Sequence, residues 1–190
     1  MKASGFRHQA SGVLLLLLVG GCRSTAPSAN ETPLTPAQAL ESVHSIRAMI
    51  RVRVSNAQRT DSFRALLIVE PSTQRVELTA YTPVGTSAMT IFADHDHVVF
   101  LNHIDRVAWE GDAKSLDIFG GATPSAWALA TLGYSSGNVA VAYDAATKHA
   151  TIERGAEKVD ITTLEAYSSD ASPRALKIPR DYQCCVAPKL

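Results

Sequence analysis

Histidines and carboxylates that could bind a metal gather in one short stretch of the chain. His95 and His97 flank Asp96, and Asp94 and His103 lie nearby. A His-x-His pair on a strand places both rings on one face, where they can coordinate a metal ion. Here the pair falls in a predicted turn, and no cysteine or glutamate is placed to complete the ligand set. We therefore expect no metal site and no cofactor.

Motifs of covalent or nucleotide chemistry are absent from the sequence. It contains no Gly-x-Ser-x-Gly elbow, His-Glu-x-x-His pair, glycine-rich phosphate loop or dinucleotide fingerprint. The formal net charge is zero, and no basic stripe is present that could bind nucleic acid. We expect a protein that is not an enzyme and does not bind nucleic acid. The 190 residues fit one domain, and 46% are apolar, enough for a core.

The reactive residue that stands out is Cys22, because of what precedes it. A basic start is followed by the apolar run 13–19 and two glycines. Seven residues of helix span only ~10 Å, against ~30 Å of membrane hydrocarbon, so the run cannot cross a bilayer. The arrangement resembles a bacterial lipobox, which implies that residues 1–21 are a signal peptide and that Cys22 is acylated. The alternative is an ordinary secretory peptide with a chance cysteine.

The same resemblance implies a location. The residue after the cysteine is Arg23 and not aspartate, which by Gram-negative sorting rules favours the outer membrane. We expect a protein anchored by lipid to the periplasmic face of the cell outer membrane. Residues 22–35 contain the cysteine and a stretch rich in serine, threonine, alanine and proline, typical of a flexible tether.

The last ten residues, 181–190, contain the adjacent Cys184 and Cys185. A disulfide between neighbouring cysteines would be strained. An intermolecular bond or a reactive thiol is the functional alternative. We favour a dispensable tail.

The elements that must position any site are mostly strands. Thr35, Pro36 and Gln38 form a helix start, which predicts a helix over 36–45. Apolar residues then alternate with polar ones, with turn residues between the runs. This pattern predicts strands near 50–54, 63–69, 75–80, 89–93, 98–101, 106–110, 139–143, 150–153, 159–166 and 175–178. Between them, residues 113–119 and the segment from Thr123 to Gly133 predict two short helices.

These elements predict a mainly β (α+β) domain over 36–180. An antiparallel sheet of ten strands is ~48 Å wide, and such sheets curl because they are twisted. Arg51, Arg53, Arg75, Glu77 and Thr79 place polar side chains on one face, which we expect to be wet. Three helices of ~10 Å diameter cover at most ~30 Å of the other face. The uncovered part predicts an apolar groove suited to an acyl chain.

The lipobox, the first helix, the strand meander, the turn Thr82-Pro83-Val84-Gly85-Thr86 and the helical break resemble LolB and the wider LolA/LolB-like family. The resemblance covers most of residues 36–180. It implies a curved antiparallel half-barrel of about ten strands, with short helices lying as a lid on the concave face. It also implies an outer-membrane lipoprotein that accepts lipoproteins from a LolA-like periplasmic carrier and inserts them into the outer membrane.

The turn is the most specific part of the resemblance. Proline and glycine build a tight turn that holds one apolar residue outward. Pro83, Val84 and Gly85 match a family turn whose exposed leucine helps to place the lipid in the membrane. The resemblance therefore implies a membrane-insertion turn with Val84 at its tip. The alternative is a plain hairpin turn.

The lid would be formed by 113–119 and 125–132, with Trp127 nearest the mouth. Arg64 interrupts an apolar strand and would bond the lid or lie at the rim. The candidate residues of the acyl-binding groove, each of which is otherwise plain core, are Ile50, Val52, Phe63, Ala65, Leu67, Val76, Leu78, Met89, Ile91, Leu116, Phe119, Trp127 and Leu129.

A second function remains open. In that case side chains fill the groove of the same fold and no lipid cargo is bound. The protein then serves as an envelope scaffold that binds a partner complex through its surface.

Overall fold

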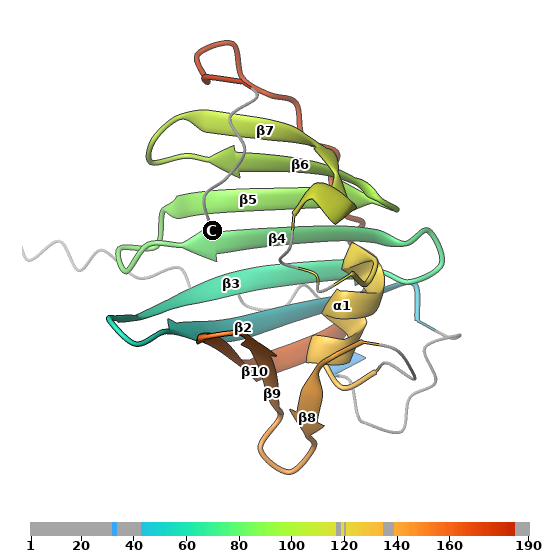
Figure 1. Ribbon diagram of the computed structural model, residues 1–190. Helices are drawn as coiled ribbons and strands as arrows, with labels where there is room; N and C mark the ends of the chain where they lie inside the picture. Colours follow the sequence, from blue (N-terminus) through green and yellow to red (C-terminus); the bar gives the residue numbers. More distant parts are fainter. Residues whose placement is uncertain (1–31, 34–42, 117–118, 120, 135–138, 185–190) are drawn as a thin grey trace, which may run out of the picture.

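The computed structural model describes residues 32–33, 43–116, 119, 121–134 and 139–184. In this part of the chain ten strands form one antiparallel sheet in the order β7-β6-β5-β4-β3-β2-β10-β9-β8, with β1 added beside β10 (Figure 1). The elements are β1 Thr32–Pro33, β2 Ser45–Ser55, β3 Thr60–Glu70, β4 Arg75–Tyr81, β5 Ser87–Asp94, β6 His97–Asn102, β7 Val107–Asp112, η2 Ala113–Ser115, α1 Pro124–Thr131, β8 Ala142–Asp144, β9 His149–Arg154 and β10 Glu157–Ser169.

The predicted fold class is confirmed as a mainly β, open and curved antiparallel sheet. The path of pairings runs from β7 to β8 and does not return to its start, so the sheet is not closed. Two irregularities in strand register, between Thr163 and Glu165 and between Ala80 and Tyr81, add local bends. These bends and the normal twist of strands curl the sheet around one face.

The described residues after 112 contain less helix than predicted. The described residues hold one α-helix, α1, which packs against β3, β4 and β9. The single helix predicted over 113–119 is wrong, because the 3₁₀ turn η2 ends at Ser115 and Leu116 lies in an extended conformation. The helix predicted over 36–45 lies outside the described residues up to 42, and Ser45 already begins β2.

Helix α1 is formed by the signals predicted for it. The Thr123 hydroxyl accepts a hydrogen bond from the Ala126 backbone N–H, and proline occupies the first turn. At the other end Gly133 adopts a φ of +81°. The Tyr134 N–H then donates to Leu129 O and the Gly133 N–H to Ala130 O, which is a Schellman motif.

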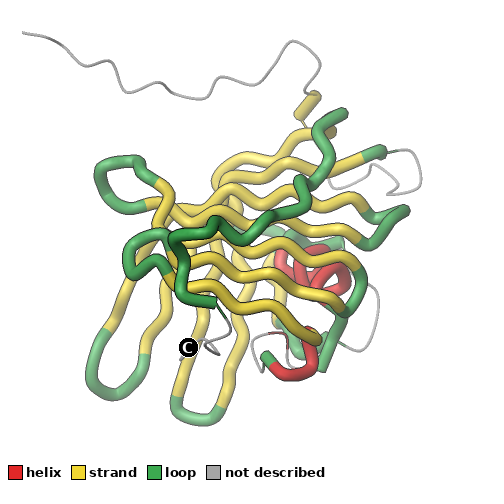
Figure 2. Tube along the Cα trace, turned by 90° about the horizontal axis from the view of Figure 1, so that it is seen from above, coloured by secondary structure: helices red, strands yellow, loops and turns green. Residues whose placement is uncertain are grey.

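The segment after β10 crosses the convex face of the sheet as an ordered strap, residues 172–183 (Figure 2). Leu176, Ile178 and Tyr182 pack on the small apolar cluster of Val99, Leu101 and Ala108. At its end Gln183 pairs in parallel with Val107 at the sheet edge. Strap residues thus cover apolar side chains and an otherwise open strand edge.

This strap bears on three predictions. The strand predicted over 175–178 is wrong, since the described backbone there pairs with no strand. The convex face is not uniformly wet, because Val99 and Leu101 are buried on it. The tail predicted from 181 includes Tyr182 and Gln183, which both contact the sheet.

Candidate functional site

The concave face carries one large apolar cluster whose burial changes along the strands. Residues that lie side by side on β2, β3, β4 and β5 form rows across the sheet, and the rows on this face are apolar. At the Ser45 end of β2, the row containing Ile46, Val69 and Val76 is buried. Toward the Ser55 end, the side chains become half-exposed. The concave face is therefore buried at one end of the strands and partly exposed at the other, which we call its open end.

The residues at the open end come from several strands. Val54 lies near the end of β2, Phe63 near the start of β3 and Met89 near the start of β5. Val159 of β10 lies directly opposite Val54. All four are half-exposed and pack against the main cluster. Helix α1 lies in front of the sheet toward the opposite end of the strands (Figure 1).

The structure brings all thirteen candidate groove residues into this one cluster. Eight are buried, from strands β2, β3 and β4 and the segment after η2: Ile50, Val52, Ala65, Leu67, Val76, Leu78, Leu116 and Phe119. The remaining five are half-exposed: Phe63, Met89, Ile91, Trp127 and Leu129. The buried set forms the base of the concave face, and the half-exposed set can be reached from outside.

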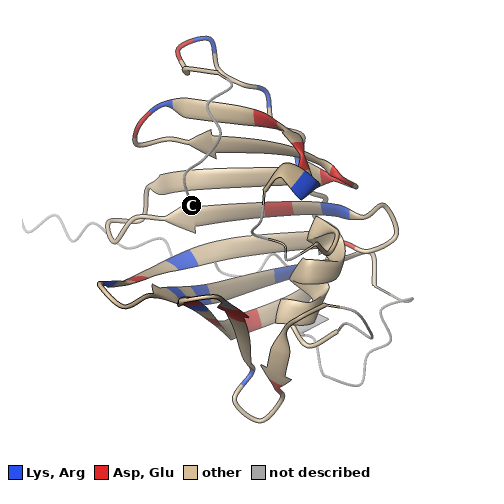
Figure 3. Cartoon of the chain, viewed as in Figure 1, with Lys and Arg blue, Asp and Glu red and all other residues tan. Residues whose placement is uncertain are grey.

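Trp127 of α1 carries an unusual polar atom in this apolar setting. Its ring packs edge-on against Phe119, with ring centroids 5.8 Å apart. The indole Nε1 is buried and has no hydrogen-bond partner among the described residues. An unpaired buried N–H costs ~1–3 kcal/mol, so this donor would gain from a carbonyl or ester oxygen brought by a ligand. α1 has no charged residue, so no charge from the helix competes for that oxygen (Figure 3).

The turn between β4 and β5 projects Val84 into solvent, with 85% of its surface exposed. The Thr82 and Thr86 hydroxyls hydrogen-bond to each other at 2.8 Å across the base of the turn. The Gly85 N–H donates to Thr82 O, and Gly85 has a φ of +84°, which suits glycine. The turn is thus fixed by its own hydrogen bonds while its tip stays free.

The histidines considered as metal ligands bind separate partners. His95 Nδ1 lies 2.8 Å from Asp94, and His97 Nε2 lies 3.0 Å from Glu110. His103 hydrogen-bonds to the Tyr182 hydroxyl. Hydrogen bonding to His95 holds the pKa of Asp94 below its ordinary value. Within the described ranges, no group of three or more His, Cys, Asp or Glu residues is placed to hold a metal ion.

A serine, a histidine and a glutamate meet near the start of β2. His44 Nε2 lies 3.2 Å from Ser172 Oγ and 3.9 Å from Glu70 Oε1. A catalytic relay needs the serine at one ring nitrogen and the acid at the other. Here both neighbours face the same nitrogen, so this geometry does not activate the serine.

The convex face carries the polar side chains of the central strands. Arg51 and Arg64 lie directly opposite each other on β2 and β3, and both are exposed. Because Ala65 and Phe63, its neighbours along β3, point into the concave cluster, Arg64 points away from it. The expectation that Arg64 bonds the lid or lies at the groove rim is therefore wrong.

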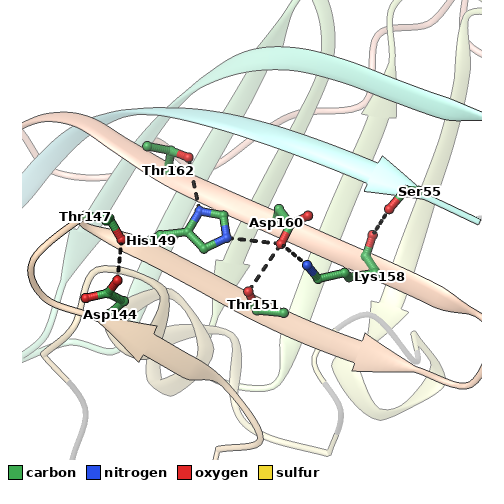
Figure 4. A network of polar contacts seen from close by, with 8 residues as sticks. All are labelled: Ser55, Asp144, Thr147, His149, Thr151, Lys158, Asp160 and Thr162. Atoms are coloured by element: carbon green, nitrogen blue, oxygen red, sulfur yellow. Dashed lines mark hydrogen bonds and ion pairs between the residues drawn. The ribbon is translucent and has the colours of Figure 1, made fainter.

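A polar network joins β9 and β10 on the same face (Figure 4). One oxygen of Asp160 lies 3.1 Å from His149 Nε2, 3.1 Å from Lys158 Nζ and 3.2 Å from Thr151 Oγ1. His149 Nδ1 reaches Thr162 at 3.3 Å. Burial raises the pKa of Asp160, but hydrogen bonds from Lys158 and His149 outweigh it and hold the pKa below its ordinary value. The network ties together the strands at this side of the sheet.

Sequence reasoning missed three contributors to the open end. Val54 continues the apolar alternation of the candidates Ile50 and Val52 on β2, and Val159 begins the strand predicted over 159–166, so the alternation could have identified both. Ile104, 68% exposed in the turn between β6 and β7, carried no such signal.

No helix in the described part of the chain has the length and apolar character needed to cross a bilayer.

A scan against models of known protein families gives no match for this sequence, and a search among curated proteins gives none either.

Proposed function

We propose that this chain is an outer-membrane lipoprotein, anchored through acylated Cys22, that binds acyl chains on its concave face. Its cargo would be lipoproteins received from a LolA-like periplasmic carrier and inserted into the outer membrane. The observation that carries the proposal is the graded burial of the concave face, sealed near Ser45 and half-exposed near Ser55. Each methylene of a bound chain that leaves water contributes ~0.8 kcal/mol.

The indole N–H of Trp127 also supports the proposal of an acyl ligand. The buried Nε1 of Trp127 has no partner in the described part of the protein. An acyl chain brings an ester or amide carbonyl that can accept this hydrogen bond, whereas an alkane cannot. Binding and release need no covalent step and no cofactor.

The resemblance to LolB supports the direction of transfer. In this proposal Val84 leads the cargo into the bilayer, because its side chain is 85% exposed at the tip of a hydrogen-bonded turn. Replacing Val84 with glutamate would place a charge where an apolar side chain must enter lipid. If lipoproteins still reach the outer membrane normally in a strain carrying Val84→Glu, the membrane-insertion role of this turn is wrong.

The acyl-binding test uses residues 30–190 without the anchor. The purified protein is analysed for co-purified lipid by mass spectrometry and titrated with a fluorescent fatty acid. Met89→Trp fills the open end with an apolar ring and should weaken fatty-acid binding at least fivefold. The matched control, Arg51→Trp, adds the same ring on the convex face and should bind like the wild type.

A scaffold function is the alternative, and one observation favours it. Eight of the thirteen candidate groove residues are already buried, so much of the concave face is core. Wild-type protein that carries no lipid and takes up no fatty acid would favour the scaffold.

A further inference from the structure

Two large apolar side chains stand in solvent at neighbouring hairpin tips. Val84 is 85% exposed at the β4–β5 turn, and Ile104 is 68% exposed at the β6–β7 turn. Both turns lie at the same end of the strands, as expected for alternate turns of an antiparallel meander (Figure 1). Exposed apolar groups gathered at one end of a protein commonly mark a contact with a partner or a membrane.

The turn that carries Ile104 is held in place by one side chain. The Asn102 side-chain oxygen accepts hydrogen bonds from the backbone N–H groups of Ile104 and Asp105, each at 3.0 Å. The Asn102 amide nitrogen donates to the Asp105 carboxylate at 2.9 Å. This arrangement fixes the turn and leaves the Ile104 side chain outside it, as the paired threonines do for Val84.

The two hairpins are joined to each other behind their tips. The His103 N–H donates to Ala88 O at 2.9 Å, which connects the β6–β7 turn to β5. The His103 ring bridges Thr90 at 2.8 Å and Tyr182 at 2.7 Å, so strand β5 and the strap hold it on both sides. These hydrogen bonds tie the β6–β7 turn to β5 and to the strap.

The same end of the strands is where the concave face is open. Phe63 and Met89 are half-exposed there, in contrast with the buried rows at the other end. A bilayer that touches both tips would thus meet the mouth of the apolar face. A protein partner on the tips alone would leave that mouth in water.

We propose that Ile104 and Val84 form a two-point contact that enters the acyl region of a phospholipid bilayer and directs the open end of the concave face toward it. The inference rests on the proposed function, because it names the bilayer as the acceptor of the bound chain. It adds Ile104, which the resemblance to LolB did not indicate. Arg106, two residues along the turn, forms an ion pair with Asp181 of the strap at 3.4 Å, which adds a further contact behind the tip.

The test measures depth in a membrane. The full chain, with Cys184→Ser and Cys185→Ser, receives a single environment-sensitive fluorophore on Ile104→Cys, Val84→Cys or Gln74→Cys. Gln74 is an exposed residue of the β3–β4 turn, at the opposite end of the strands. Each protein is reconstituted into vesicles of phosphatidylethanolamine and phosphatidylglycerol whose acyl chains carry bromine, a short-range quencher.

We expect the probes at 104 and 84 to be quenched at least threefold more than the probe at 74. A probe at 104 that is quenched no more than the probe at 74 overturns the two-point contact. Fatty-acid binding by the wild-type chain, measured separately, tests the proposed function. Normal fatty-acid binding with an unquenched probe at 104 refutes only this inference, and a quenched probe without fatty-acid binding refutes only the acyl-carrier function.

Discussion

Removing the contacts of Tyr182 should destabilise the whole domain, although Tyr182 falls in a segment predicted to be a tail. The ring is half-buried over the cluster of Val99, Leu101 and Ala108. Its hydroxyl lies 2.7 Å from His103 Nδ1, and the two rings meet edge-on at 6.0 Å. Strap and sheet are thus joined by one polar and one apolar contact at the same residue.

Two substitutions separate these contacts. Tyr182→Phe removes only the hydrogen bond, which should lower the free energy of unfolding by about 1 kcal/mol. Tyr182→Ala also removes the ring, and a fully buried aromatic costs ~3–5 kcal/mol on truncation to alanine. Because Tyr182 is only half-buried, we expect a total loss of about 2–3 kcal/mol. In a domain of this size, Tm should fall by about 3 °C and about 8 °C respectively.

Urea unfolding of residues 23–190, followed by tryptophan fluorescence, measures these differences. Lys177→Ala is the matched control, since Lys177 lies in the same strap with its side chain exposed. It should stay within about 0.5 kcal/mol of the wild type. If Tyr182→Ala is equally silent, the strap does not belong to the folded unit, and the interpretation of residues 181–190 as a dispensable tail would be right.

Three further experiments test other contacts. Asp160→Asn should lower stability by ~1.5–3 kcal/mol at pH 7, where a charged acceptor is lost. Folding lowers the pKa of Asp160, so the difference in free energy of unfolding between wild type and variant should have its full value above about pH 4. It should shrink as the pH falls through the folded-state pKa. Urea unfolding at pH 7 and pH 3 measures this change. Gly133→Ala should destabilise more than Gly85→Ala in thermal unfolding, since both have positive φ but only at Gly133 would the new methyl group collide with the Tyr143 ring. Trp127→Phe should weaken the binding of a fluorescent ester lipid about fivefold and of a plain fluorescent hydrocarbon less than twofold, because only the N–H is lost; equal losses would contradict a hydrogen bond to the ester.

The parts of the fold that depend on local pattern were predictable. Alternation of apolar and polar residues placed β3, β4 and β5 within a few residues, because every second side chain of these strands lies in the main cluster. The threonine-proline start and the glycine stop identified α1, because caps and positive φ are local requirements. The thirteen candidate groove residues share one cluster for the same reason.

The parts that depend on distant contacts were not. Residues 175–178 have the alternation of a strand, but β10 already has β2 on one side and β9 on the other. The segment therefore packs its apolar residues on the convex face instead of joining the ladder. The exposed tip at Ile104 was missed because exposure of one isoleucine in a turn leaves no periodic signal.

The pairing of β1 with β10 limits the distance between Cys22 and the hairpin tips. Thr32 lies beside Ser168, which is opposite Ile46, so the chain leaves the sheet at the end remote from the hairpin tips. Along the strand direction, the tips lie about eight residues away, or ~27 Å. The ten residues from Cys22 to Thr32 can span at most ~35 Å. If Cys22 carries the lipid, a molecule whose strands stand perpendicular to the bilayer, with the tips at its surface, would need most of that length. Deleting four residues between Cys22 and Thr32 would then force the strands to tilt toward the membrane plane.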